Sequence, residues 1–182
     1  MTKDSHLSEV FPLPPLIAYK RPPNIRDKLI RAKVPEIVNR PKRDLPGMKK
    51  CNNCPICPYV KVGKSVKSTA NKYTIDINTT VNCRSINVIY LLECKKCREQ
   101  YTGETERTLQ DRFSAHLGYV RNTHLTKATG FHFNQPGHKI SDMQITIIEK
   151  LHNFDSQFRK KREEMYINDF NTYYKGMNRQ AS

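Results

Sequence analysis

The sequence predicts a small mixed α/β (α+β) domain on a three-stranded sheet, in the C-terminal half of a 182-residue chain. Between residues 87 and 170 the spacing of the apolar residues changes between the pattern typical of a strand and that typical of a helix. The predicted order is strand, strand, helix, short helix, strand, helix. Ten of the eleven prolines lie at or before Pro58, and proline at that density prevents continuous helix or central strand. We therefore expect one sizeable core, C-terminal to the proline-rich part.

The first two strands are predicted to form a hairpin. Residues 87–93 contain a continuous apolar run that is short enough for a buried strand, and a second strand covers 100–103. Cys94 and Cys97 lie between the two runs. The turn of the hairpin would therefore carry both thiols.

A helix, a third strand and a second long helix follow the hairpin. Thr105 is predicted to cap a helix over 106–121, in which one apolar stripe is formed by Leu109, Phe113, Leu117 and Val120. From 143 to 151 apolar residues alternate with mostly polar ones, as expected for a strand with one buried face. The last helix is predicted over 156–170.

The net charge of +15 is unevenly distributed and favours a polyanionic partner. Residues 1–86 hold 17 Lys and Arg against 6 Asp and Glu, and residues 87–182 hold 15 against 11. We divide the chain into a basic proline-rich arm (1–47), a cysteine-containing connector (48–84) and the folded domain (85–178). Because no apolar run approaches the ~18 to 20 residues of a membrane span, we expect no membrane partner.

Four cysteines lie in or near the connector: Cys51, Cys54, Cys57 and Cys83. They could close a zinc knuckle, because a short loop with little apolar content needs a cross-link to stay folded. They could equally be free thiols, since the loop between Cys57 and Cys83 is longer than most knuckles use. The sequence leaves both interpretations open.

Two tripeptides in the hairpin resemble those of a known nuclease family. The tripeptides are Val88-Ile89-Tyr90 and Tyr101-Thr102-Gly103, and their tyrosines are 11 positions apart. They are similar to the two tripeptides that name the GIY-YIG endonucleases. The family name has Gly where this chain has Val88, and Ile where it has Thr102; both replacements suit strands. The resemblance implies an antiparallel sheet flanked by helices.

The residues after the hairpin follow the order of that family. The resemblance implies a catalytic set of Tyr90, Tyr101, Arg112, His116, Glu163 and Asn178. Arg112 and His116 are four positions apart on one predicted helix, so they share a face on which a phosphate would meet both. The planar guanidinium suits phosphate because it donates two parallel hydrogen bonds and keeps its charge. The alternative is an ordinary solvated pair on a helix surface.

Two neighbouring glutamates compete for the metal role that the resemblance implies. Glu163 shares a helix face with Ile167 and Phe170, which should pack inward, whereas Glu164 shares its face with polar residues. We therefore choose Glu163 as the ligand of one Mg²⁺ (or Mn²⁺), a hard ion that takes few protein ligands. The water that attacks phosphorus would lose its proton through Tyr90 or His116, and the sequence does not decide between them.

A cysteine pair and a histidine pair narrow the resemblance to the endonuclease of Penelope-like retroelements. The signature of that endonuclease is a cysteine pair between the two tripeptides and a histidine pair farther along the chain. This sequence matches it with Cys94, Cys97, His132 and His138. Two thiolates and two imidazoles form a zinc site that would tie the hairpin to the loop after the first helix. The alternative is two buried thiols and two surface histidines, and His124 is a competing ligand.

The arm is also similar to the sequence that joins the reverse transcriptase of such an element to its nuclease. The chain would then be the C-terminal part of a polyprotein. The resemblance implies a nuclear, metal-dependent DNA endonuclease that nicks target DNA for integration, with element RNA and a reverse transcriptase domain as further partners. One rival is a catalytically inactive, zinc-stabilised nucleic-acid-binding domain. Another is a repair-type nuclease, against which the cysteine insertion and the arm argue.

Overall fold

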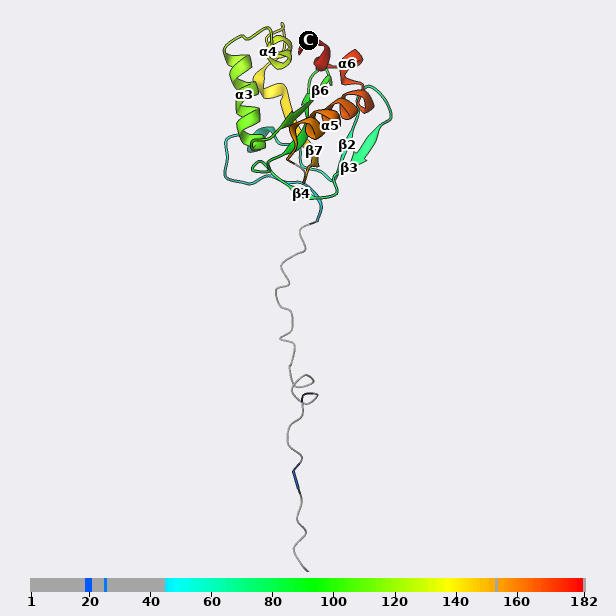
Figure 1. The fold of residues 1–182 in the computed structure, drawn as a ribbon. Helices are drawn as coiled ribbons and strands as arrows, with labels where there is room; N and C mark the ends of the chain where they lie inside the picture. Colours follow the sequence, from blue (N-terminus) through cyan, green and yellow to red (C-terminus); the bar gives the residue numbers. More distant parts are fainter. Residues whose placement is uncertain (1–18, 21–24, 26–44, 153, 182) are drawn as a thin grey trace, which may run out of the picture. The chain divides into compact units, whose positions relative to one another are not determined.

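The computed structural model describes residues 19–20, 25, 45–152 and 154–181 (Figure 1). The predicted arm of residues 1–47 therefore lies almost wholly outside the described residues. Residues 44–182 form one compact unit, which holds the sheet and the helices around it.

The central sheet is three-stranded and antiparallel, which confirms the predicted fold class. Its strands are β5 (Val88–Cys94), β6 (Gln100–Thr105) and β7 (Met143–Lys150), in the spatial order β6-β5-β7. Every residue of β5 is buried, as its apolar run predicts. Tyr90 pairs with Gly103, and Leu92 pairs with Tyr101. Directly paired residues face the same side of a sheet, so Tyr101 lies on the face of Leu92. Tyr90 is two positions before Leu92 on the same strand and faces that side as well, so the two tyrosines share one face.

Four α-helices accompany the sheet in the described part of the chain (Figure 1). They are α3 (Leu109–Arg121), α4 (Ala128–Phe133), α5 (Ser156–Asp169) and α6 (Thr172–Lys175), with short 3₁₀ turns η2 (Ile140–Asp142) and η3 (Met177–Ala181). No helix among the described residues is both long and apolar enough to cross a membrane.

The predicted start of the first long helix was wrong by one helical turn. The N-cap is Thr108, whose side chain accepts a hydrogen bond from the backbone N–H of Asp111, and the helix begins at Leu109. Thr105 is instead the last residue of β6, where it pairs with Val88. Both threonines can cap a helix, but Thr105 remains extended because strand pairing continues through it.

The connector packs against the sheet unit. Strand β1 (Gly47–Met48) spans its start, and the connector contains the 3₁₀ turn η1 (Cys57–Tyr59), β2 (Ser65–Lys67), β3 (Thr74–Asp76) and β4 (Thr80–Val81). Strands β2 and β3 form an antiparallel hairpin, and β1 pairs with β4. Ile56 and Val60 are buried, and the ring of Tyr59 lies 5.1 Å from that of Phe113 on α3. The connector thus shares the hydrophobic core of the domain.

Candidate active site and metal centres

Tyr90, at the centre of β5, holds two side chains of α3. The Nε–H of Arg112 donates to the Tyr90 hydroxyl oxygen at 2.8 Å, and His116 Nε2 lies 2.7 Å from the same oxygen. The two α3 residues share a face, as their spacing predicts, but they lie at different depths. His116 is 2% exposed behind Tyr90, whereas Arg112 is half-buried. Of the two, only Arg112 reaches the surface in this structure, and a phosphate that contacts both side chains stays a prediction.

The glycine of the second tripeptide makes room for Tyr90. A Cβ at position 103 would overlap the hydroxyl and ring carbon of Tyr90, and it would also press on the ring of Tyr101. The rings of the two tyrosines are 6.5 Å apart. Position 103 therefore requires glycine for close approach rather than for backbone freedom.

Burial sets the protonation states of this cluster. It raises the pKa of Tyr90 well above the usual value, and the opposing effect of the Arg112 charge is smaller. Burial also lowers the pKa of His116 to about 3, with the Arg112 charge acting in the same direction. The phenol thus keeps its proton and the imidazole is neutral.

Glu163, on α5, is half-buried, whereas the rival Glu164 is exposed. Burial and the nearby carboxylate of Glu104 raise the pKa of Glu163 to about 7, and the charge of Arg112 lowers it. Among the described residues, no cationic side chain forms an ion pair with Glu163. A half-buried carboxylate without an ion partner, beside a second carboxylate, suits a hard divalent cation with oxygen ligands. The residues present therefore fit Mg²⁺ or Mn²⁺.

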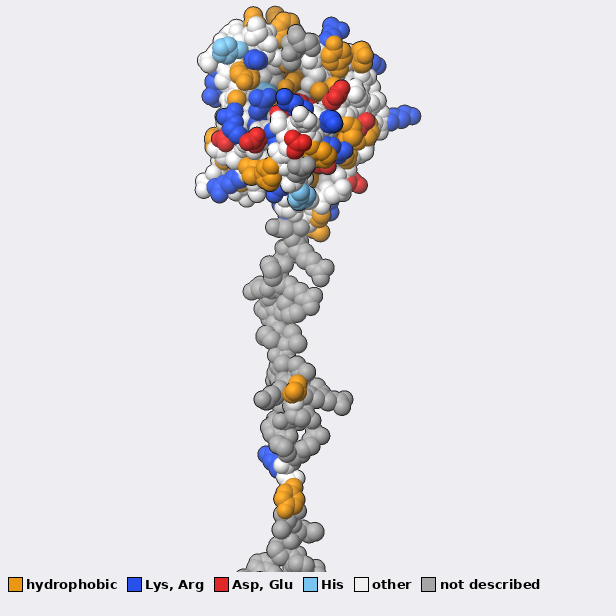
Figure 2. All heavy atoms as spheres, viewed as in Figure 1, with side chains coloured by type: hydrophobic (Ala, Val, Ile, Leu, Met, Phe, Trp, Pro, Cys, Tyr) orange, Lys and Arg blue, Asp and Glu red, His pale blue; other side chains and the backbone are white. Residues whose placement is uncertain are grey.

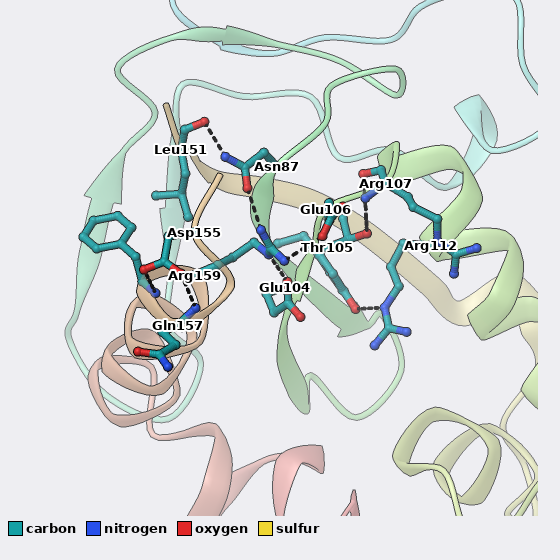
Figure 3. A network of polar contacts seen from close by, with 12 residues as sticks. Asn87, Glu104, Thr105, Glu106, Arg107, Arg112, Leu151, Asp155, Gln157 and Arg159 are labelled. Carbon is teal, nitrogen blue, oxygen red and sulfur yellow. Dashed lines mark hydrogen bonds and ion pairs between the residues drawn. The ribbon is translucent and has the colours of Figure 1, made fainter. Parts of the chain in front are cut away.

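A network of charged residues joins α5 to the sheet beside this carboxylate (Figure 3). Arg159 is 3% exposed, and it forms ion pairs with Glu104 and Glu106 and donates to the Asn87 side chain at 3.1 Å. The Asn87 side-chain nitrogen in turn donates to the carbonyl of Leu151. Because Arg159 is one helical turn before Glu163, this network fixes the part of α5 that carries the candidate metal ligand.

An open cavity of about 400 Å³ lies between Arg112 and this network. It is lined by Glu104, Thr105, Glu106, Arg107, Arg112 and Arg159. Figure 2 shows Lys and Arg side chains gathered with acidic ones across the middle of the face on which Figure 1 draws β6 between α3 and α5. The cavity thus offers guanidinium groups to an anion, with carboxylates beside them.

Asn178, in η3, contacts the backbone of the second tripeptide. Its side-chain oxygen accepts from Thr102 N–H at 2.9 Å, and its side-chain nitrogen donates to Thr102 C=O at 2.8 Å. Both of its polar groups are thereby occupied. The side chain ties the C-terminal turn to the outer edge of β6.

The predicted zinc ligands Cys94, Cys97, His132 and His138 come together. Their candidate ligand atoms all lie within 4.8 Å of one another, and Cys97 Sγ is 3.4 Å from His132 Nε2. The other ring nitrogen of His132 faces the Glu99 carboxylate at 3.6 Å, an arrangement that commonly orients a metal-binding imidazole. Burial and the neighbouring His138 lower the pKa of His132 to about 4, which keeps it neutral.

His138 provides the observation that tests whether this cluster fits zinc. Neither of its buried ring nitrogens has a hydrogen-bond partner in the described part of the chain. A metal ion at the centre of the cluster would satisfy one of them, and two thiolates with two imidazoles form a closed zinc set. The rival ligand His124 lies outside the cluster.

The four connector cysteines form a second cluster with atoms within 4.8 Å of one another. The sulfur of Cys57 lies 3.6, 3.4 and 3.8 Å from those of Cys51, Cys54 and Cys83. Although burial disfavours its thiolate, hydrogen bonds from Cys54 and Cys51 lower the pKa of Cys57 to about 6. All four are free thiols, so the cluster also fits zinc. The β2–β3 hairpin takes up the long gap before Cys83.

Sequence reasoning missed several residues around these sites: Glu99, Glu104, Arg159 and Thr129, whose hydroxyl oxygen lies 2.9 Å from His116 Nδ1. Only Arg159 carried a usable signal, because it is four positions before Glu163 and so shares its helix face. The others contact residues from distant parts of the chain, and the spacing of residues along the sequence does not predict such contacts.

The family comparison agrees with this fold at the level of the domain. Residues 86–178, about half of the chain, match the family described as the GIY-YIG catalytic domain. Among solved structures, the catalytic domain of homing endonuclease I-TevI aligns with 17% sequence identity and a TM-score of 0.42, covering 50% of this chain and 95% of that chain. A search of curated proteins gave no match.

Proposed function

Because the chain belongs to the GIY-YIG nuclease family through residues 86–178, we propose that it is a metal-dependent DNA endonuclease that hydrolyses phosphodiester bonds. The observation that carries this proposal is that Arg112, which lines the open cavity, is hydrogen-bonded to Tyr90 and lies close enough to Glu163 for its charge to lower the pKa of that carboxyl. The three side chains come from β5, α3 and α5, and an ordinary surface ion pair does not require that convergence.

Arg112 is the residue that would hold the scissile phosphate. Its Nε–H is occupied by Tyr90, which fixes the orientation of the guanidinium. The surrounding phenols outweigh the effect of burial and raise the pKa of Arg112, so its charge persists at any working pH. A persistent, oriented guanidinium stabilises negative charge as it builds on phosphorus.

Tyr90 and His116 would move the proton of the attacking water. Tyr90 is itself buried, so the attacking water would have to enter the cluster beside Arg112 for the Tyr90 oxygen to take its proton. The phenol proton of Tyr90 would then pass to His116 Nε2, 2.7 Å away. Glu163 would hold Mg²⁺ or Mn²⁺, which when bound stabilises charge on the developing and departing oxygens. Tyr101 borders the same cluster, and Asn178 supports the strand that carries it.

We propose that the nuclease serves target-site nicking in a Penelope-like retroelement, with zinc in both cysteine clusters. The support is the cysteine pair between the two tripeptides and its clustering with the two histidines, together with the basic arm in the sequence. DNA is the proposed substrate, and a nuclear location, element RNA and a reverse transcriptase domain complete the proposed setting.

Plasmid nicking, measured beside DNA binding, tests the nuclease proposal. Arg112→Ala should lose about 10²-fold or more in nicking rate because a fixed charge at the reacting phosphate is removed, while DNA binding and fold persist. Arg121→Ala, an exposed arginine on the same helix, is the matched control and should nick normally. If folded, zinc-loaded wild type binds DNA and never nicks it, the protein is the rival nucleic-acid-binding domain.

A further inference from the structure

Thr129 contacts the candidate catalytic cluster from the side opposite Tyr90. Its hydroxyl oxygen lies 2.9 Å from His116 Nδ1, and Thr129 is itself buried. His116 is thus held between two hydroxyl groups, one on each ring nitrogen. A neutral imidazole has one N–H and one acceptor nitrogen, so these two partners determine its tautomer.

The hydrogen bonds of Tyr90 indicate which tautomer is present. Arg112 can only donate, so its bond uses the Tyr90 oxygen as an acceptor. The phenol hydrogen then has His116 Nε2 as its partner among the described residues. A phenol, with an ordinary pKa of ~10, is more acidic than an aliphatic hydroxyl and is therefore the stronger donor. The bond from Tyr90 to an unprotonated Nε2 is thus favoured over one from Thr129 to Nδ1. The proton of His116 is then on Nδ1 and is donated to Thr129.

The position of Thr129 is fixed by the packing of α4 against α3. The Asn134 side chain donates to the carbonyls of Val120 at 3.0 Å and Gly130 at 2.7 Å, which joins the two helices. A Cβ at position 130 would overlap the carbonyl of His124, so the backbones approach closely there. Helix α4 also carries His132 of the Cys2His2 cluster. Thr129 is therefore held on a short helix with contacts at both ends.

We propose that Thr129 is a positioning residue that accepts the Nδ1–H of His116 and so keeps Nε2 unprotonated toward the Tyr90 hydroxyl. This role rests on the proposed nuclease function, in which Nε2 receives the phenol proton. Thr129 acts through His116 and does not touch substrate. Without its hydroxyl, the buried Nδ1–H loses its acceptor, which favours the tautomer that cannot take the proton of Tyr90.

The tautomer of His116 can be measured directly by nitrogen and carbon NMR of the full chain, with assignment from His116→Gln. We expect the Nδ1–H tautomer in wild type, a shift toward Nε2–H in Thr129→Val, and the wild-type form in Thr129→Ser, which keeps the hydroxyl. Plasmid nicking by Thr129→Val should fall about tenfold or more in kcat with KM unchanged, and Thr129→Ser should restore it. The exposed Thr126→Val is the matched control.

The NMR result decides the Thr129 proposal even if wild type cuts no DNA. Nε2–H in wild type, or a wild-type tautomer in Thr129→Val, would overturn it. So would a changed tautomer in the hydroxyl-bearing Thr129→Ser, or a shifted tautomer in Thr129→Val with unchanged kcat. Failure of the nuclease proposal is seen separately, as absence of nicking by wild type whose His116 has the expected tautomer.

Discussion

Gly103 lies directly opposite Tyr90 in the pairing of β5 with β6, and the Tyr90 hydroxyl fills the space that a side chain at 103 would need. That hydroxyl is also the shared partner of Arg112 and His116. The two tripeptides of the sequence are therefore one structural unit, in which the glycine of the second admits the tyrosine of the first.

Replacing this glycine should disable the site. Gly103→Ala should lower the nicking rate by about 10²-fold, because displacement of the Tyr90 hydroxyl by even 1 Å misplaces Arg112. Gly118→Ala on α3 is the control, since nothing lies within 4 Å of a Cβ there. The control should stay active and gain about 0.5–1 kcal/mol in stability from helix propensity. Full activity of Gly103→Ala would contradict the packing argument.

The raised pKa of Glu163 has a consequence for stability. The pKa rises from the ordinary 4.5 to about 7 on folding, so between these values the folded state binds more protons than the unfolded chain. The contribution of Glu163 to the free energy of unfolding therefore falls as pH rises through that window. Glu163→Gln should remove this dependence, so the variant should gain stability relative to wild type from about pH 5 to 7.

Urea unfolding at a series of pH values, without added Mg²⁺, measures this difference. Added Mg²⁺ should stabilise wild type more as the pH rises and the carboxylate forms, and it should have little effect on Glu163→Gln. A stability difference between the two proteins that does not change with pH would show that Glu163 is solvated like an ordinary surface glutamate.

The metal content should be two zinc ions per chain. Cys97→Ser and Cys57→Ser should each lose one, because each removes a thiolate from a different four-residue cluster. His124→Ala should keep both. Atomic absorption of the purified proteins gives the count, and a chelator should lower the unfolding temperature of wild type. Zinc content that is unchanged in Cys97→Ser would exclude the Cys2His2 site.

Arg159 should be a large contributor to stability. Arg159→Leu removes the buried guanidinium that donates to Glu104 and Asn87, and loss of a buried hydrogen-bond partner costs about 1–3 kcal/mol. Lys160→Leu, at the exposed next position, should change the free energy of unfolding by less than about 0.5 kcal/mol. Equal urea midpoints for the two variants would mean that the network contributes nothing measurable.

Much of the fold could be predicted because the apolar residues of its helices and strands recur at regular spacings. The apolar run of β5, the alternation along β7 and the stripe of α3 each specify an element. The helix start was misplaced because Thr105 and Thr108 are both good caps. Asp111, three positions after Thr108, was the available signal, since an acidic residue there is typical of a capped first turn.

The sequence could not predict how deeply the site's side chains are buried or which distant residues they contact. Spacing placed Arg112 and His116 on one face but could not say that His116 would be covered by Tyr90. Burial likewise outweighs the Arg112 charge at Tyr90, so the pKa of the phenol is raised rather than lowered. The apolar pattern of α5 indicates which face is inward, and Glu163 is accordingly more buried than Glu164. The role of Glu163 as the metal ligand stays a prediction.

The most direct test of the account is Mg²⁺-dependent nicking of supercoiled plasmid by wild type, Glu163→Gln and Glu164→Gln. The two variants make the same chemical change at adjacent positions, one half-buried beside the cavity residue Glu104 and one exposed. The account predicts that wild type and Glu164→Gln nick the plasmid only when Mg²⁺ or Mn²⁺ is present, while Glu163→Gln binds DNA and leaves it intact. Nicking by Glu163→Gln at the wild-type rate would contradict it.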